Sequence, residues 1–209
     1  MTLLALEFSS DRRSAAVARD DLCLAEAVQH TDSRATDAFG LVTRALADAG
    51  VSRREIEVIA VGLGPGSYTG IRAAIAMAQG WQLAAGIRLL GVSSAETIAR
   101  RAQAENIFGL VHVMIDAQRG EFYVAVWDVS TDGCREISPL KIVSGGEAAS
   151  LKQAGKILAE PEVDRVLLPR AVDIARLASH RTNFVSGEQL EPIYLRQTTF
   201  VKAAPGRTA

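Results

Sequence analysis

The same succession of elements occurs twice along this chain, and this internal repeat limits the fold more than any other feature. In each half a short apolar strand ends on a carboxylate, at Glu7 and at Asp116. A polar turn with arginine follows, and a second strand then leads through an acidic turn into a third. Such a repeat predicts two similar lobes, each built from a β-meander and helices, with a cleft between them.

Hydrophobic periodicity and turn residues place the elements of the two halves. In the first half we expect strands at 3–8, 14–19, 22–30, 56–61 and 88–92, and helices at 36–49, 71–85 and 94–104. In the second half we expect strands at 109–115, 121–128, 136–143 and 163–168, helices at 146–154 and 169–179, and an extended piece at 193–195. The predicted division is a first lobe at 1–105, a shorter second lobe at 106–200 and a flexible tail at 201–209.

Charge and cysteine usage exclude several classes of protein. Lys and Arg number 23 against 24 Asp and Glu, so this chain by itself is a poor candidate for strong nucleic-acid binding. Its two cysteines form no CxxC motif and no Cys/His pair, which argues against a disulfide scaffold or a zinc site. Two free thiols fit a reducing cytoplasm. We expect no signal peptide, because the N-terminus lacks a basic start and Glu7 interrupts its short apolar run. We expect no membrane span, because no uninterrupted apolar run reaches 18 residues.

The glycine-rich segment 62–72 follows a predicted strand and opens a predicted helix. Such a loop can present free N–H groups and a positive helix end to an anion, with hydroxyls from Ser67 and Thr69. It is no Walker A loop, because it lacks Gly-Lys-Ser/Thr, and Ser67 stands where a dinucleotide fingerprint has its third glycine. Pro65 also excludes a nucleophile elbow. The alternative is a tight strand-to-helix turn that needs glycine for positive φ and close packing.

The two carboxylates at the strand ends also have two interpretations. In a two-lobed phosphotransferase, Glu7 and Asp116 would hold magnesium through water or act as a base. Alternatively, each caps its adjacent turn. The three histidines, His30, His112 and His180, lack metal-ligand spacing, so no metal site is predicted.

The predicted helix at 71–85 is apolar almost all the way around. Only Arg72, Gln79 and Gln82 make a polar stripe, whereas a helix on a protein surface should be half polar. This pattern predicts burial on two sides, by another part of the chain or by a partner. Together with the helix at 36–49, it could form half of a four-helix contact with another protein.

Five segments in order along the chain carry a resemblance to a known family: LLALEFSSDRRSAAVA, GLGPGSYTGIRAAIAMAQGWQLA, GVSSAETIA, IDAQRGEFYVAVW and EPIYLR. Together they resemble the TsaB (YeaZ) family, and GPGSYTGIR is the most specific of the motifs. The resemblance implies the duplicated actin-like, sugar-kinase-like fold (ASKHA, ribonuclease H-like), with a shortened second lobe.

The resemblance also implies a function. Proteins of this family are non-catalytic dimerisation subunits that bind a TsaD-type enzyme, which transfers threonylcarbamoyl to the adenosine next to the anticodon of tRNA. ATP and metal are then expected on the TsaD-type partner and not on this chain, and a TsaE-type ATPase is a further partner. A homodimer through the same helices is the competing assembly, and tRNA is reached only through the complex.

For individual residues, the resemblance implies an interface and no catalytic or metal-binding group. The predicted partner-binding residues are Phe39, Val42, Thr43, Leu46, Ala73, Ala76, Met77, Gly80 and Trp81. The signature loop, with a structural role, comprises Gly64, Pro65, Gly66, Ser67, Tyr68, Thr69, Gly70 and Arg72.

The sequence departs from the family pattern at three places, and those at Glu7 and at 144–168 count against a magnesium–phosphate role and a complete nucleotide pocket. Glu7 stands where the family usually has Asp, and the usual His-Ser-Glu opening of the first helix reads His30-Thr-Asp-Ser here. The region 144–168 is short and lacks a glycine-containing strand. An independent kinase-like ATPase or phosphotransferase of the same fold is the alternative function. A protease lacks support, because no nucleophile arrangement is apparent.

Overall fold

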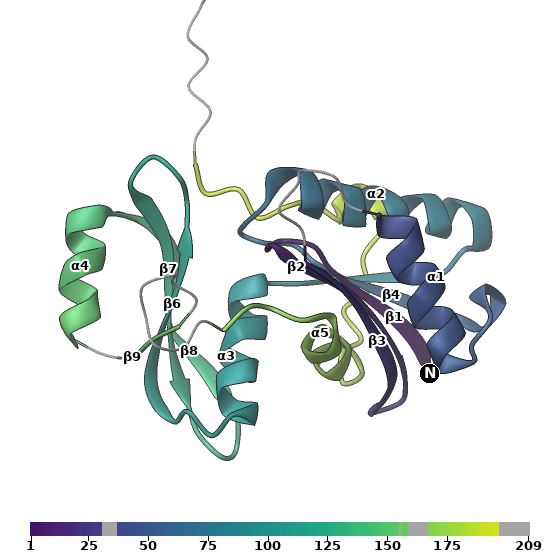
Figure 1. Cartoon of the computed structure of the whole chain (residues 1–209), viewed down its shortest axis with the longest axis horizontal. Coiled ribbons are helices and arrows are strands. Elements are labelled where there is room, and N and C mark those ends of the chain that lie inside the picture. The colour runs from purple at the N-terminus through teal and green to yellow at the C-terminus, as the bar shows by residue number, and fades with distance from the viewer. Residues whose placement is uncertain (31–36, 155, 159–166, 197–209) are drawn as a thin grey trace, which may run out of the picture.

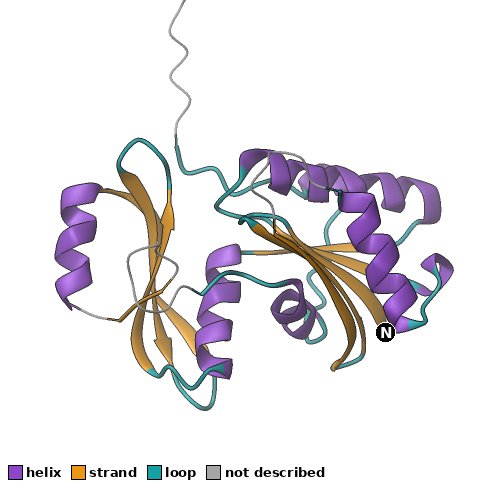
Figure 2. Cartoon of the chain, viewed as in Figure 1, coloured by secondary structure: helices purple, strands orange, loops and turns teal. Residues whose placement is uncertain are grey.

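The computed structural model describes residues 1–30, 37–154, 156–158 and 167–196, and these form two β-sheets with helices on both faces of each (Figures 1 and 2). The first sheet has the order β3-β2-β1-β4-β5. Its strands are β1 (Thr2–Glu7), β2 (Arg12–Arg19), β3 (Leu22–His30), β4 (Val58–Gly62) and β5 (Arg88–Val92). The second sheet has the order β8-β7-β6-β9. Its strands are β6 (Gly109–Asp116), β7 (Glu121–Val129), β8 (Cys134–Ser144) and β9 (Lys156–Leu158).

The two sheets repeat one topology, which confirms the predicted internal repeat. The first strand of each half, β1 or β6, pairs antiparallel with the strand that follows it. On its other side each pairs in parallel with a later strand, β4 or β9. The ends of β1 and β6 carry Glu7 and Asp116, as the sequence pattern predicts.

The helices make each sheet the middle of three layers (Figure 1). On one face of the first sheet lie α1 (Ala38–Ala49) and α2 (Tyr68–Ala85), and on the other lies α5 (Ala171–Ala178). The second sheet lies between α3 (Ser94–Ala104) and α4 (Gly145–Ala154). Two short 3-10 turns occur at Arg53–Glu55 and Gly187–Gln189.

Burial on both faces explains why β1 reads as a continuous apolar run and not as an alternation. Leu4, Leu6 and Phe8 point into the core under α1 and α2. Leu3 and Ala5 point to the opposite core under α5. Every residue of β1 is therefore buried.

The C-terminal part of the chain returns to the first sheet, which differs from the predicted lobe at 106–200. Helix α5 packs on β1, β2 and β4, and the bridge between Leu89 and Val185 attaches the following segment to β5. Conversely, α3 belongs to the predicted first lobe but packs on β6, β7 and β8. The physical reason is that both faces of the first sheet are apolar and must be buried. Helices α1 and α2 cover one face, and α5 covers the other with Ala171, Ile174 and Ala178.

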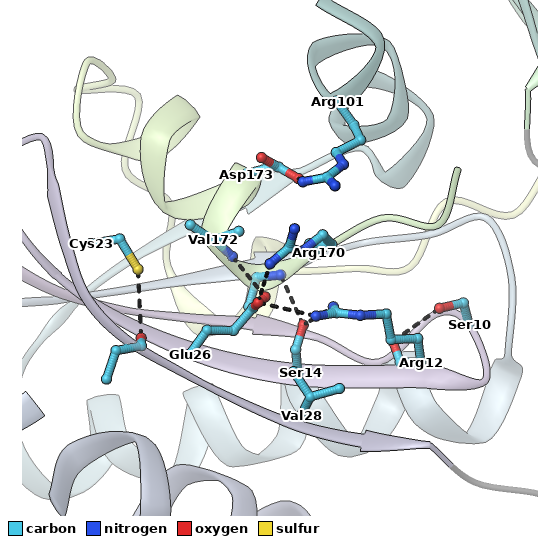
Figure 3. Close-up of polar contacts among 12 residues, drawn as sticks. Ser10, Arg12, Ser14, Cys23, Glu26, Val28, Arg101, Arg170, Val172 and Asp173 are labelled. Atoms are coloured by element: carbon cyan, nitrogen blue, oxygen red, sulfur yellow. Dashed lines mark hydrogen bonds and ion pairs between the residues drawn. The ribbon is translucent and has the colours of Figure 1, made fainter. Parts of the chain in front are cut away.

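Glu26 of β3 fastens α5 to this sheet (Figure 3). Its Oε2 accepts hydrogen bonds from Arg170 Nη2 at 2.6 Å and from Arg12 Nη2 at 3.0 Å, and its Oε1 accepts from the Val172 N–H at 3.3 Å. Beside it, Ser14 Oγ accepts from the Ala171 N–H at 2.9 Å. Burial acts to raise the pKa of Glu26, but the bonds from Arg170 and Arg12 outweigh it, so the pKa lies below its usual value.

Other boundaries differ from the sequence expectation by a few residues. Helix α2 begins at Tyr68 and not at 71, because Ser67 caps it by accepting a hydrogen bond from the Gly70 N–H. Helix α5 begins at Ala171, two residues after Pro169, and β9 was not predicted. The predicted helix start at 36, most of the strand at 163–168 and the tail at 201–209 lie outside the described residues. Within the described part of the chain, no helix is both long and apolar enough to cross a membrane.

Candidate partner-binding surface

The glycine loop forms a close-packed turn between β4 and α2. The Ser67 N–H donates to Ser9 O at 2.7 Å, and the Gly70 N–H donates to Ser67 Oγ at 3.3 Å. A Cβ at Gly66 would overlap Ser9 O, and one at Gly70 would overlap Phe8 O. Gly66 also has φ +147°, which a side chain rarely tolerates. These are the contacts of a strand-to-helix turn, and the two N–H groups are already used inside the chain.

Glu7 is fully buried, so its carboxylate does not face the cleft that the sequence predicts between the two lobes. Its Oε1 accepts from the Ser9 N–H at 2.7 Å and its Oε2 from Ser94 Oγ at 2.9 Å. The carboxylate lies so close to Gly62 that a Cβ there would overlap it. Burial raises the pKa of Glu7, against the opposing effect of these hydrogen bonds.

Asp116, at the equivalent strand end, is exposed and caps its own turn. Its Oδ1 accepts from the Gln118 N–H at 2.7 Å and its Oδ2 from Gln118 Nε2 at 2.9 Å. Gln118 has φ +65° in this turn. Each carboxylate therefore accepts a hydrogen bond from the turn that follows its strand, and that of Glu7 also accepts one from Ser94 at the start of α3. Within the described ranges, no three His, Cys, Asp or Glu side chains gather as a metal site would require.

An apolar hollow of about 410 Å³ lies between α1 and α2. Its lining residues are Phe39, Val42, Arg53, Ala76, Met77, Gly80, Trp81 and Ala84. Six of these eight belong to the set predicted to bind a partner. Phe39 is 73% exposed at its edge, and Leu83 on α2 is 89% exposed. We call this hollow with its edge residues Phe39 and Leu83 the α1–α2 face.

The other three predicted interface residues are not among the lining residues of the hollow. Leu46 belongs to the core under the helices and is buried. Thr43 is exposed, and its hydroxyl accepts a hydrogen bond from Arg53 Nη2 at 3.3 Å. Ala73 is half-buried on α2.

Sequence reasoning missed two lining residues, Arg53 and Ala84. Ala84 follows Ala76 and Gly80 at spacings of four, so helical periodicity could have found it. Arg53 comes from the 3-10 turn after α1, and nothing in the local pattern directs it to this hollow.

The α1–α2 face is open because α2 buries only one side on the sheet. Ile71, Ala74, Ile75 and Ala78 are buried, whereas Ala76, Gly80 and Ala84 are exposed. Among the hollow's lining residues, Arg53 alone carries a charge. Exposed apolar hollows of this kind mark places where another molecule binds.

A second hollow, of about 590 Å³, lies between α3 and α5. Its lining includes Arg100, Asp173, Arg176 and Arg181. Most of these charges are paired: Arg176 Nη1 lies 3.3 Å from Asp173 Oδ1, and Arg181 pairs with Glu96. Nothing in the sequence had singled out these residues.

Comparisons with known proteins agree on one family. A family model described as "TsaD: tRNA N6-adenosine threonylcarbamoyltransferase" matches residues 33–194. An Escherichia coli (strain K12) protein described as "tRNA threonylcarbamoyladenosine biosynthesis protein TsaB" is 30% identical over 240 residues, covering 99% of this chain and 100% of that one. The chain belongs to the TsaB (YeaZ) family. A Haemophilus influenzae protein with the same description is 27% identical, covering 99% of this chain and 98% of that one.

Solved structures of the family share the fold. The structure of YeaZ from Pseudomonas aeruginosa has a TM-score of 0.79 and 28% identity, covering 92% of this chain and 100% of that chain. Together with the duplicated topology of the two sheets, this likeness confirms the predicted actin-like, sugar-kinase-like fold.

Proposed function

We propose that this TsaB-family chain is a non-catalytic subunit that binds a TsaD-type enzyme through the α1–α2 face. In that complex it supports threonylcarbamoyl transfer to the adenosine next to the anticodon of tRNA. The observation that carries the proposal is the open apolar hollow between α1 and α2. Two helices that present small and apolar residues suit a partner that adds two helices of its own.

The geometry at the strand ends supports a non-catalytic role. A kinase-like alternative needs carboxylates that can reach magnesium or a substrate hydroxyl. Glu7 is enclosed by Ser9, Gly62 and Ser94, and Asp116 is turned onto Gln118. The loop N–H groups of Ser67 and Gly70 bond within the chain. We therefore propose that ATP and metal bind the TsaD-type partner, that a TsaE-type ATPase joins the complex, and that tRNA is reached through it.

A charge placed in the hollow tests this proposal. Ala76→Glu puts a carboxylate on the exposed side of α2, where a partner helix would have to bury it. We expect at least a tenfold loss of affinity for the TsaD-type protein of the same genome, measured by calorimetry. Circular dichroism should show an unchanged fold, because Ala76 is exposed in the free chain.

Ala149→Glu is the matched control, because Ala149 is an exposed alanine of α4 on the other sheet. It should bind the partner as the parent chain does. Parent-like affinity of a well-folded Ala76→Glu variant would contradict the assigned surface.

A further inference from the structure

Two exposed tyrosines and an arginine from distant parts of the chain form a cluster beside the glycine loop. Tyr68 is 56% exposed at the start of α2, and Tyr194 is 50% exposed in the C-terminal segment. The Arg72 guanidinium carbon lies 4.4 Å from the centroid of the Tyr68 ring, and Arg72 Nε donates to Tyr194 Oη at 3.1 Å. The two ring centroids are 5.8 Å apart. We call these three residues the Tyr–Arg–Tyr cluster.

The Arg72 guanidinium can bind a further group through its two outer nitrogens. The hydrogen bond to Tyr194 uses Nε, and the Tyr68 ring covers one face of the guanidinium plane. Among the described residues, no carboxylate forms an ion pair with Arg72. The outer nitrogens of an arginine held flat in this way are suited to a bidentate pair with a carboxylate.

The Tyr–Arg–Tyr cluster is continuous with the α1–α2 face. Tyr68, Arg72, Ala76, Gly80 and Ala84 follow one another at intervals of four residues on α2, so they form one row along the helix. All five are exposed. Because Arg72 is one turn from Ala76, a partner that covers Ala76 on the α1–α2 face lies close to Arg72.

We propose that the Tyr–Arg–Tyr cluster is a second contact point for the same TsaD-type partner, where Arg72 pairs with a carboxylate of that protein. This inference rests on the proposed function. Tyrosine and arginine are enriched among the residues that dominate binding energy at protein interfaces. A protein fits better than RNA, because the cluster contains a single cation and the chain has a net charge of −1.

Arg72 could simply hold the C-terminal segment in place through Tyr194. Other hydrogen bonds also attach that segment, which argues against this purely structural role. The Ile193 N–H donates to Leu63 O at 2.9 Å. Arg196 Nη2 donates to Ala117 O at 3.0 Å and also pairs with Glu121. Loss of the Arg72 contact should therefore leave the segment in place and the chain folded.

The test compares Arg72→Gln with Arg88→Gln. Arg88 is also exposed and also lies over an aromatic ring, with its guanidinium carbon 4.7 Å from the Phe184 centroid, but it belongs to β5 and not to the row on α2. Both changes remove one charge. We expect Arg72→Gln to weaken binding of the TsaD-type protein at least tenfold at low salt, and less at 0.5 M salt. Arg88→Gln should change it less than twofold.

The outcomes separate this inference from the proposed function. One outcome would contradict this inference alone: the parent chain and Arg72→Gln bind the partner equally well, whereas Ala76→Glu does not bind. The proposed contact at the Tyr–Arg–Tyr cluster would then be wrong, and the proposed binding through the α1–α2 face would remain supported. If Arg72→Gln leaves the protein–protein affinity unchanged but weakens tRNA binding by the assembled complex, the cluster binds RNA and the inference is overturned. Failure of the parent chain to bind the partner would instead contradict the proposed function.

Discussion

At the scale of single residues, two glutamates on the first sheet, the half-buried Glu26 and the fully buried Glu7, have pKa shifts in opposite directions. Glu26 accepts hydrogen bonds from Arg170 and Arg12, and its pKa is lowered, so it is held as a charged group. Glu7 is buried beside Ser9 and Ser94, no cation among the described residues bonds to it, and burial raises its pKa. The first stabilises the fold in its charged form, whereas the second costs stability when it ionises.

Glu26→Gln should destabilise the chain at neutral pH by about 2 kcal/mol, because two arginines lose their anionic partner. The stabilisation by Glu26 is present above the unfolded pKa of about 4.3 and is lost as the pH falls through the lower folded pKa. Urea denaturation at pH 7 and in acid measures this. Asp128→Asn is the control, since Asp128 pairs with Arg135 at the surface and should cost less than about 1 kcal/mol. Equal effects of the two changes would contradict the assigned role of Glu26.

Glu7→Gln should change the stability of the chain in the opposite direction and stabilise it at neutral pH. Because the folded pKa of Glu7 is raised, ionisation costs stability at a pH above that value, and the cost disappears as the pH falls toward the unfolded pKa. Glutamine can still accept from the Ser9 N–H and bond to Ser94 without a charge. Calorimetry should therefore show the variant gaining in Tm over the parent chain as the pH rises from 5 to 8. If the gain in Tm instead shrank as the pH rose over this range, the raised pKa of Glu7 would be wrong.

At the scale of elements, helix α2 contains glycines with two different roles. Gly70 approaches Phe8 O so closely that a Cβ would overlap it. Gly80 has open space around its Cβ position and lines the hollow on the α1–α2 face. Only the first is required by the fold of the free chain.

Alanine at each position separates these roles. Gly70→Ala should destabilise the chain by about 2 kcal/mol or more, because backbone must shift. Gly80→Ala should stabilise the free chain by about 0.5–1 kcal/mol through helix propensity. Thermal denaturation of both variants measures the difference. If Gly80→Ala destabilised the free chain as strongly as Gly70→Ala, Gly80 would have a packing role that its open surroundings do not show.

The sequence predicts most elements of the fold, for physical reasons that particular residues show. The apolar run of β1, the glycine stop after α1 and the missing polar face of α2 are local signals. The return of α5 to the first sheet is not local. It depends on Glu26 and Arg170, which are 144 residues apart, and no period or spacing in the sequence links them.

The candidate site likewise has residues that the sequence can identify and residues that depend on contacts between distant parts of the chain. Sequence reasoning, through the family resemblance, points to Ala76, Met77, Gly80 and Trp81, which line the hollow together. It cannot assign Leu46, which the core of this chain buries. Nor can it bring Tyr194 to Arg72 across 122 residues.

At the scale of the whole molecule, two three-layer units bury their own cores, and the described residues leave the apolar α1–α2 face open. Each sheet is covered on both faces by helices of the same chain, as Figure 1 shows. None of the described elements covers the α1–α2 face. The proposed function therefore depends on the complex that we propose this surface forms.

Light scattering coupled to size-exclusion chromatography tests that claim most directly. The chain is run alone, then with the TsaD-type protein of the same genome, and then as Ala76→Glu with the same protein. We predict a new heteromeric peak for the parent mixture and separate peaks for the variant. A parent mixture that stays as two separate peaks, even with ATP and the TsaE-type protein present, would contradict the account.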